Sequence, residues 1–139
     1  EGHDFAQILA ASNVALAAMA IGVSSAALDY AIEYAKDRDV FGVKVAQKQA
    51  IAFMIAEMGT TIEAIRLLVW EAAWMIDEGK PDSSKQAYLA LSGAMDAVMM
   101  VTDRAVQILG GHGYIREHPV EMWMRNGRGF AAFNGLAIV

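Results

Sequence analysis

The sequence predicts an all-α fold, an up-and-down four-helix bundle with three long helices and a shorter C-terminal one. Apolar residues recur at intervals of three and four residues over long segments, the spacing of a helix face. Only two prolines interrupt the chain, and short connections separate the apolar segments, as expected for antiparallel neighbours. No alternating strand pattern of useful length is present.

The first predicted helix runs from Phe5 to about Asp37. Asp4 can cap its N-terminus, and Gly22 is the only glycine within it. Abundant alanine lets neighbouring helices approach on several sides, which indicates a central helix. The segment from Phe5 to Leu28 has no charge and is long enough to cross a bilayer. Its polar residues, its alanine content and its lack of basic or aromatic flanks favour a buried helix over a membrane span.

The second and third helices are predicted from one apolar face each. The second ends at Gly79-Lys80-Pro81, where glycine suits a left-handed cap and proline stops the helix. Asp82, Ser83 and Ser84 offer the next N-cap. The apolar positions that define the two faces are Ile51, Ile55, Met58, Ile62, Ile65, Val69 and Ile76, and then Tyr88, Leu91, Met95, Val98, Thr102, Ala105 and Leu109.

The third helix stops at Gly110-Gly111, and Pro119 lies in the first turn of a shorter last helix, over roughly residues 118–132. The apolar stripes are broad and rich in Met and Trp. Contact with another subunit or another domain would cover them, and packing within a single bundle would also account for them.

Length and composition restrict the function further. With 139 residues, of which 56% are hydrophobic, the chain suits a single domain over residues 1–139. The net charge of −5 provides no basic face for nucleic acid. The chain has no cysteine, which removes disulfide and thiolate chemistry.

Several residues have both a structural and a functional interpretation. Arg38, at the end of the first helix, suits the negative helix terminus, and its guanidinium also suits a pyrophosphate. Gly110-Gly111 suits a helix cap, and it also lets a ligand approach bare backbone. His112 and His118, near Glu117 and Glu121, suggest a metal, but their spacing is irregular and no metal is expected. Glu121 and Arg125 are four apart and are expected to form an ion pair.

Two motifs together carry a family resemblance. One is Gln107-Ile-Leu-Gly110-Gly111-His-Gly113-Tyr114, followed by Pro119-Val-Glu121 and Arg125; the other is Arg38-Asp-Val-Phe41-Gly42, followed by Gln49. They resemble the flavin-binding signature of the acyl-CoA dehydrogenase C-terminal domain. The resemblance covers about residues 2–138, the last third of a complete family member. The family's N-terminal and middle domains are not in this sequence.

The resemblance implies FAD as the cofactor and assigns its contacts. Arg38 would reach the FAD pyrophosphate of a neighbouring subunit, and Phe41 and Gln49 would contact the same cofactor. Gln107, Gly110 and Gly111 would face its adenine-ribose side.

The catalytic position departs from the family pattern. The family's usual glutamate, which removes the α-proton of the acyl-CoA thioester, falls on Asn134, and an amide cannot act as a base. Relatives that carry the base on the first helix have it at the position of Ser12, beside Asn13, where arginine is common. The serine at this position cannot act as the base unaided.

The sequence therefore predicts the C-terminal, FAD-contacting and oligomerising domain of an acyl-CoA dehydrogenase-like flavoprotein in the cytoplasm, one not expected to turn over by itself. The implied partners are acyl-CoA, further subunits in a homodimer, tetramer or heteromer, and an electron-transfer flavoprotein if the protein is active. Neither nucleic acid nor a membrane is expected. The alternatives are a catalytically deficient subunit of a heteromer, altered flavin chemistry that needs no glutamate, and a non-enzymatic helical interaction module.

Overall fold

The computed structural model describes residues 4–132, which form four α-helices, a two-stranded hairpin and two 3₁₀ turns. The predicted all-α bundle, with three long helices and a shorter last one, is confirmed. The helices are α1 (Phe5–Asp37), α2 (Gln49–Asp77), α3 (Ser83–Leu109) and α4 (Val120–Ala132). Between them lie β1 (Asp39–Val40), β2 (Val43–Lys44), η1 (Val45–Gln47) and η2 (Gly110–Tyr114).

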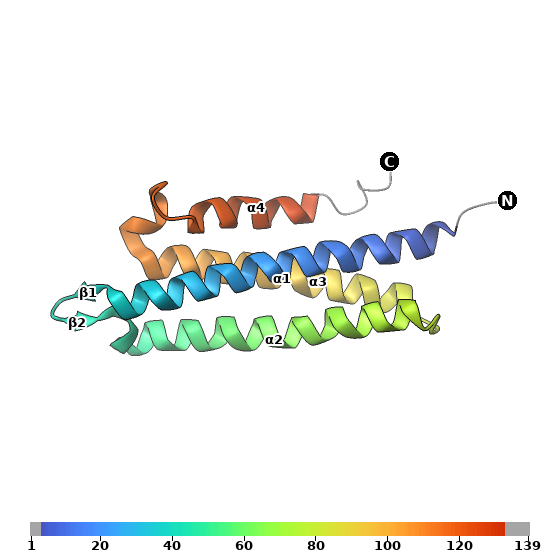
Figure 1. Ribbon diagram of the computed structural model, residues 1–139, viewed down its shortest axis with the longest axis horizontal. Coiled ribbons are helices and arrows are strands. Elements are labelled where there is room, and N and C mark those ends of the chain that lie inside the picture. Colours follow the sequence, from blue (N-terminus) through green and yellow to red (C-terminus); the bar gives the residue numbers. More distant parts are fainter. Residues whose placement is uncertain (1–3, 133–139) are drawn as a thin grey trace.

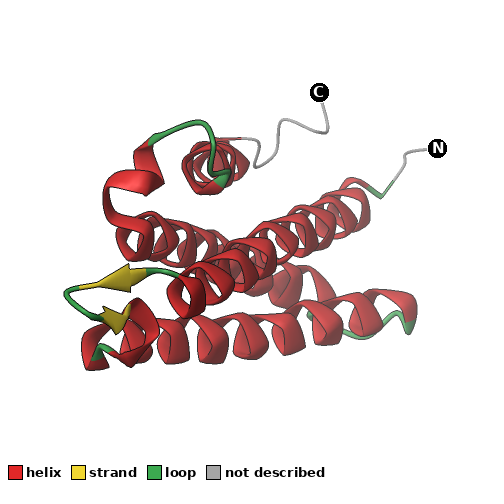
Figure 2. Ribbon diagram, turned by 60° about the vertical axis from the view of Figure 1, so that its left-hand side comes forward, coloured by secondary structure: helices red, strands yellow, loops and turns green. Residues whose placement is uncertain are grey.

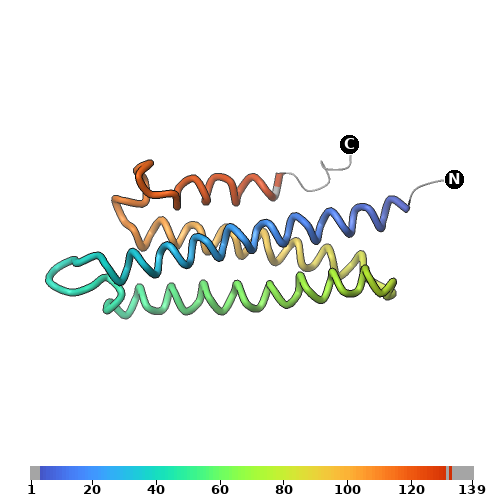
Figure 3. The backbone as a smooth tube through the Cα atoms, viewed as in Figure 1, coloured from blue at the N-terminus to red at the C-terminus, as the bar shows by residue number. Residues whose placement is uncertain are grey.

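The helices run alternately up and down, so α1 and α3 point the same way and α2 and α4 point the opposite way (Figures 1 and 3). Helices α2 and α4 lie on different sides of the α1–α3 pair, as the turned view in Figure 2 also shows. This order brings the C-terminal ends of α1 and α3 to the N-terminal end of α2, beside the hairpin. Residues far apart in sequence therefore meet at one end of the bundle.

Alanine forms much of the interface around α1. Six alanines along this helix are buried, and small side chains allow the backbones of neighbouring helices to approach. Larger apolar side chains of α2, α3 and α4 complete the core. Those that are fully buried include Met58, Ile62, Leu91, Val98, Val101 and Val120.

The predicted helix ends are largely confirmed. The Asp4 carboxylate accepts hydrogen bonds from the backbone N–H groups of Ala6 and Gln7, at 3.1 and 3.2 Å. Gly79 has the left-handed φ of 58° that its capping role requires. Asp82 is at the N-cap of α3 as predicted, but its side chain makes no capping hydrogen bond. Pro119 directly precedes α4, one position earlier than the first turn.

Two apolar surfaces stand out in the described part of the chain. Helix α1 is long and apolar enough to cross a membrane by length and composition alone, and 39% of its most apolar window is buried in the bundle. The outward face of α2 exposes four large side chains, Phe53, Leu67, Trp70 and Trp74. Packing within the bundle covers part of the apolar stripes predicted from the sequence and leaves this face of α2 open.

Candidate functional site

Arg38 is held in place by backbone hydrogen bonds on both sides. Its N–H donates to the carbonyl of Tyr34 and ends α1, at 2.9 Å. Its carbonyl accepts from the N–H of Val45 beyond the hairpin, also at 2.9 Å. Strands β1 and β2 pair antiparallel between these two bonds. The hairpin therefore fixes the backbone from which the Arg38 side chain extends.

The hairpin tip places Phe41 in a costly conformation. Phe41 and Gly42 have φ values of 55° and 77°, and positive φ at both central residues is typical of a tight hairpin turn. Glycine tolerates such a φ, whereas a bulky aromatic residue rarely adopts it. Phe41 is also 95% exposed, so core packing does not hold it there. Its ring contacts the Lys48 ammonium group, with Nζ 5.6 Å from the ring centroid.

Helix α3 ends at the glycine pair predicted to stop it. Gly110 has a φ of 58°, and its N–H bonds back to carbonyls of the last helical turn. A side chain at Gly110 or Gly111 would meet no atom of residues 4–132 within 4 Å. A side chain at Gly113 would meet the Val106 carbonyl oxygen at 2.5 Å. Packing therefore explains Gly113, and the helix cap explains Gly110, but neither explains Gly111.

The three helix ends form a cleft of about 400 Å³. Arg38, Lys48 and His112 provide its basic side chains, and Gly110 and Gly111 form part of its wall. Among the described residues, none that line this cleft is acidic. The cleft therefore suits an anion. The remaining lining residues are Tyr34, Val40, Val45, Ile51, Ile108 and Leu109.

The structure brings some of the predicted cofactor contacts together and leaves others outside the cleft. Arg38, Gly110 and Gly111 line it, whereas Phe41 lies on the hairpin tip. Gln49 and Gln107 are exposed neighbours of the lining residues Lys48 and Ile108, and they do not line the cleft themselves.

The candidate catalytic positions are less well defined. Asn134 lies outside the described residues. Ser12 is half-buried on α1. Asn13 is 4% exposed, and its side-chain oxygen has no hydrogen-bond partner among the described residues.

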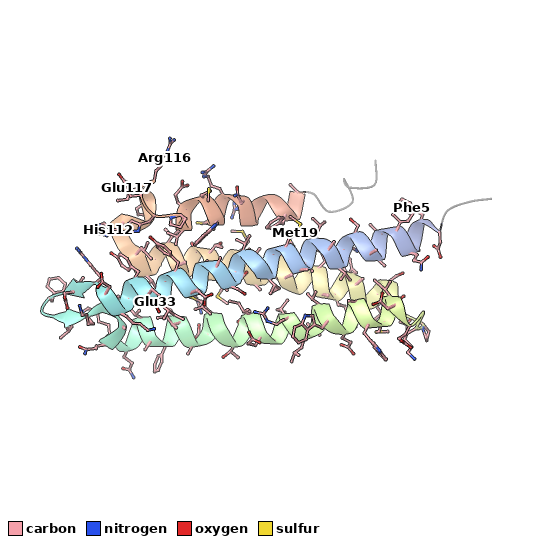
Figure 4. The ribbon with its side chains drawn as sticks, in the orientation of Figure 1. Phe5, Met19, Glu33, His112, Arg116 and Glu117 are labelled. Carbon is pink, nitrogen blue, oxygen red and sulfur yellow. The ribbon has the colours of Figure 1, made fainter. Side chains whose placement is uncertain are left out.

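Sequence reasoning missed the tyrosines that hold the histidines. The Tyr34 hydroxyl lies 2.8 Å from Nδ1 of His112, and the Tyr30 hydroxyl lies 2.7 Å from Nδ1 of His118. Tyr30, Tyr34 and Arg38 are spaced four apart, so they share one helix face, and this spacing was a usable signal. Figure 4 shows His112 at the hairpin end of the bundle, with Arg116 and Glu117 projecting outward beyond it.

Within residues 4–132, no group of three or more His, Asp or Glu side chains is arranged to hold a metal ion. The predicted pair on α4 is confirmed: Arg125 donates to both carboxylate oxygens of Glu121, at 2.8 and 3.2 Å. The hydrogen bonds from Arg125 lower the pKa of the Glu121 carboxyl below its ordinary value. The same hydrogen bonds raise the pKa of Arg125.

Comparison with known proteins gives a consistent result. Residues 4–137 match the family model described as the acyl-CoA dehydrogenase C-terminal domain. The chain is 45% identical over 124 residues to the caffeyl-CoA reductase–Etf complex subunit CarC of Acetobacterium woodii, covering 89% of this chain and 32% of that protein. It is 41% identical over 122 residues to the mitochondrial short-chain specific acyl-CoA dehydrogenase of Bos taurus, covering 88% of this chain and 29% of that protein.

A solved structure shows the same arrangement of helices. Butyryl-CoA dehydrogenase from Megasphaera elsdenii superposes with a TM-score of 0.89 at 40% sequence identity, covering 94% of this chain and 35% of that one. The chain spans about a third of the length of the curated relatives it matches, 32% and 29% in the two named above.

Proposed function

Because the chain belongs to the acyl-CoA dehydrogenase family, as its C-terminal helical domain, we propose that the cleft at the hairpin end holds part of an FAD cofactor. One observation carries this proposal. Arg38, a residue able to grip a pyrophosphate, and Gly111, a glycine with no steric reason among the described residues, line one basic cleft.

The residues present fit the chemistry of FAD. A guanidinium presents two parallel N–H groups that match a pair of pyrophosphate oxygens. Gly111 leaves backbone open for close approach, because the space where its side chain would lie is empty. The strained and exposed Phe41 is also accounted for if it meets a planar ligand, since strain without a packing reason is typical of functional sites.

The proposed contacts divide between the two parts of the dinucleotide. Arg38 and Gln49 would hold the pyrophosphate. Gln107, Gly110 and Gly111 would face the adenine and ribose. Gln49 follows the lining residue Lys48 and Gln107 precedes the lining residue Ile108, and both are exposed, so their amides would donate and accept hydrogen bonds at the rim of the cleft.

Bound FAD would accept a hydride in the oxidation of the Cα–Cβ bond of an acyl-CoA thioester. The reaction also needs a carboxylate to remove the α-proton, and neither Asn134 nor Ser12 is one. We therefore propose that a partner subunit supplies the base, or that this chain is the deficient partner in a heteromer.

Restoring the carboxylate tests whether the base has simply been lost. The full-length Asn134→Glu protein is titrated with a series of acyl-CoA thioesters, and flavin absorbance is followed. Loss of flavin absorbance in this variant and not in the wild-type protein supports simple loss of the base. No change with any thioester rejects simple loss of the base and favours altered chemistry.

The FAD proposal is tested with Arg38 and a matched neighbour. In the FAD-free full-length protein, Arg38→Gln is expected to weaken FAD binding by about 10- to 100-fold, the effect of losing a charged hydrogen-bonding partner. Lys36→Gln removes the same charge from the last turn of α1, where Lys36 pairs with Glu33 and does not line the cleft. This control should bind FAD as the wild-type protein does. Equal affinities in all three proteins would refute the proposal.

The exposed face of α2 supports further subunits as partners. Phe53 is 60% exposed, Leu67 61% and Trp70 62%, and this face is a candidate oligomer surface. An electron-transfer flavoprotein is a further proposed partner, because the name of CarC places that relative in an Etf complex.

The same apolar face favours a second candidate function, a non-enzymatic interaction module. A colourless full-length protein that binds no added FAD would favour it. A yellow protein with a flavin spectrum would favour the flavoprotein.

A further inference from the structure

Two tyrosine–histidine pairs stand side by side where α1 meets the turn after α3. Tyr34 contacts His112 and Tyr30 contacts His118, each through the hydroxyl and Nδ1. The two imidazole rings stack, with centroids 5.3 Å apart and planes inclined by 14°. Only the Tyr34–His112 pair lines the basic cleft, together with Arg38. The second pair is therefore a natural control for the first.

The Tyr34 hydroxyl has one proton and two neighbouring acceptors. It lies 2.8 Å from Nδ1 of His112 and 3.4 Å from the carbonyl oxygen of Leu109. While Nδ1 carries no proton, the hydroxyl can donate to only one of them. Once Nδ1 is protonated, the imidazole donates to the phenol oxygen and the phenol donates to Leu109. The network thus accommodates a proton on His112 without losing a hydrogen bond.

Groups from three neighbouring elements share the cleft with His112. They are Tyr34 of α1, Arg38 directly after it, Lys48 before α2, and the Leu109 carbonyl at the negative end of the α3 dipole. An anion bound in this cleft would place negative charge beside the imidazole and favour its protonated form.

The second histidine lies outside the cleft. His118 stacks on His112, with the ring centroids 5.3 Å apart. His118 packs against Tyr30 of α1, and it lines a separate surface pocket with charged residues of the preceding loop and α4. These charged residues are Arg116, Glu117, Glu121 and Arg125.

We propose that His112 is a third cationic group of the cleft and takes up one proton when the FAD pyrophosphate binds. This inference rests on the proposed function. By linkage, a ligand whose binding favours the protonated form binds more tightly at lower pH. FAD affinity therefore rises as the pH falls through the range in which histidine titrates, and the gain is lost at higher pH.

The test measures FAD affinity against pH in the FAD-free full-length protein, by quenching of flavin fluorescence. From about pH 8 to about pH 6, the wild-type dissociation constant is expected to fall roughly fivefold or more. His112→Asn keeps an amide that can pair with Tyr34 but cannot gain charge, so its dissociation constant should stay flat. His118→Asn and Tyr30→Phe alter the pair outside the cleft and should keep the wild-type pH dependence.

Calorimetry on the wild-type protein provides a second measurement that needs no variant. Titration of FAD in two buffers with different heats of ionisation counts the protons taken up. A value of about a third of a proton or more near pH 7 is expected, the uptake that a fivefold change in the dissociation constant over two pH units requires. Zero uptake, or equal pH dependence in the wild-type and His112→Asn proteins, overturns the inference while FAD binding stands. Absence of FAD binding at every pH overturns the proposed function as well.

Discussion

Two glycines packed against α3 differ in physical origin from the two glycines of the cleft wall. A side chain at Gly113 of η2 would strike the Val106 carbonyl oxygen at 2.5 Å, and one at Gly127 of α4 would strike Val98 Cγ2 at 2.8 Å. In the cleft wall, side chains at Gly110 and Gly111 would meet no atom of the described chain within 4 Å. Close packing against α3 explains Gly113 and Gly127. The proposed FAD contact would explain Gly111, which lacks both a steric reason and a positive φ.

The largest expected effect on stability concerns the two glycines packed against α3. Gly113→Ala places a methyl group against backbone that cannot turn away, and the free energy of unfolding should fall by about 2–3 kcal/mol. Gly127→Ala is the matched variant and should cost less, because Val98 presents a side chain that can adjust. Denaturant unfolding measures both. Wild-type stability in Gly113→Ala would remove the packing explanation.

The cleft wall should show the reverse behaviour. Gly111→Ala is expected to change the free energy of unfolding by less than about 0.5 kcal/mol, as is usual for surface sites. The added methyl group intrudes where the ligand approaches, so the FAD dissociation constant should rise about tenfold. Equilibrium titration with FAD, beside thermal unfolding of the same samples, provides both values. A less stable variant with unchanged affinity would make Gly111 a structural residue after all.

The hairpin tip tests whether strain serves binding. Phe41→Asn replaces an aromatic residue at a φ of 55° by one that accepts this conformation, giving the Asn-Gly pair favoured in such turns. Stability should rise by about 1 kcal/mol, the typical cost of such strain, while FAD affinity falls. Chemical denaturation and FAD titration check the two halves separately. A gain in stability without a loss of affinity would separate Phe41 from the cofactor.

The smallest effect is expected at the exposed pair on α4. The hydrogen bonds from Arg125 lower the pKa of Glu121 in the folded protein below its ordinary value of 4.5. The ion pair therefore stabilises the folded protein above pH 4.5. This stabilisation is lost as the pH falls through the lowered pKa of the folded protein. The Glu121→Gln protein should therefore unfold at a slightly lower temperature than the wild-type protein at neutral pH. In acid, the two proteins should unfold at the same temperature. A constant difference across this range would assign the effect to something other than charge.

The fold was largely predictable from the sequence because local signals repeat over many residues. The apolar faces of α2 and α3, the Asp4 cap and the Gly79 stop each depend on near neighbours, and the structure confirms them with one exception. Tyr88, predicted to belong to the apolar face of the third helix, is 58% exposed. Asp82 begins α3 as predicted, although the bond its side chain was expected to make is absent.

The site was predictable only in part, because it is assembled across the bundle. That Arg38 and Gly111 share a cleft depends on α1 and α3 running in the same direction, which no local pattern specifies. The contact between His112 and the Tyr34 hydroxyl was also missed. The two residues are 78 apart in sequence, and spacing within the histidine segment suggested only a metal.

The most direct measurement is a crystal structure of the full-length protein with FAD. The account predicts pyrophosphate oxygens within hydrogen-bonding distance of the Arg38 guanidinium, with the cofactor passing over the bare backbone of Gly111 in an assembly of two or more subunits. FAD bound elsewhere, with only solvent between Arg38 and Gly111, would contradict it.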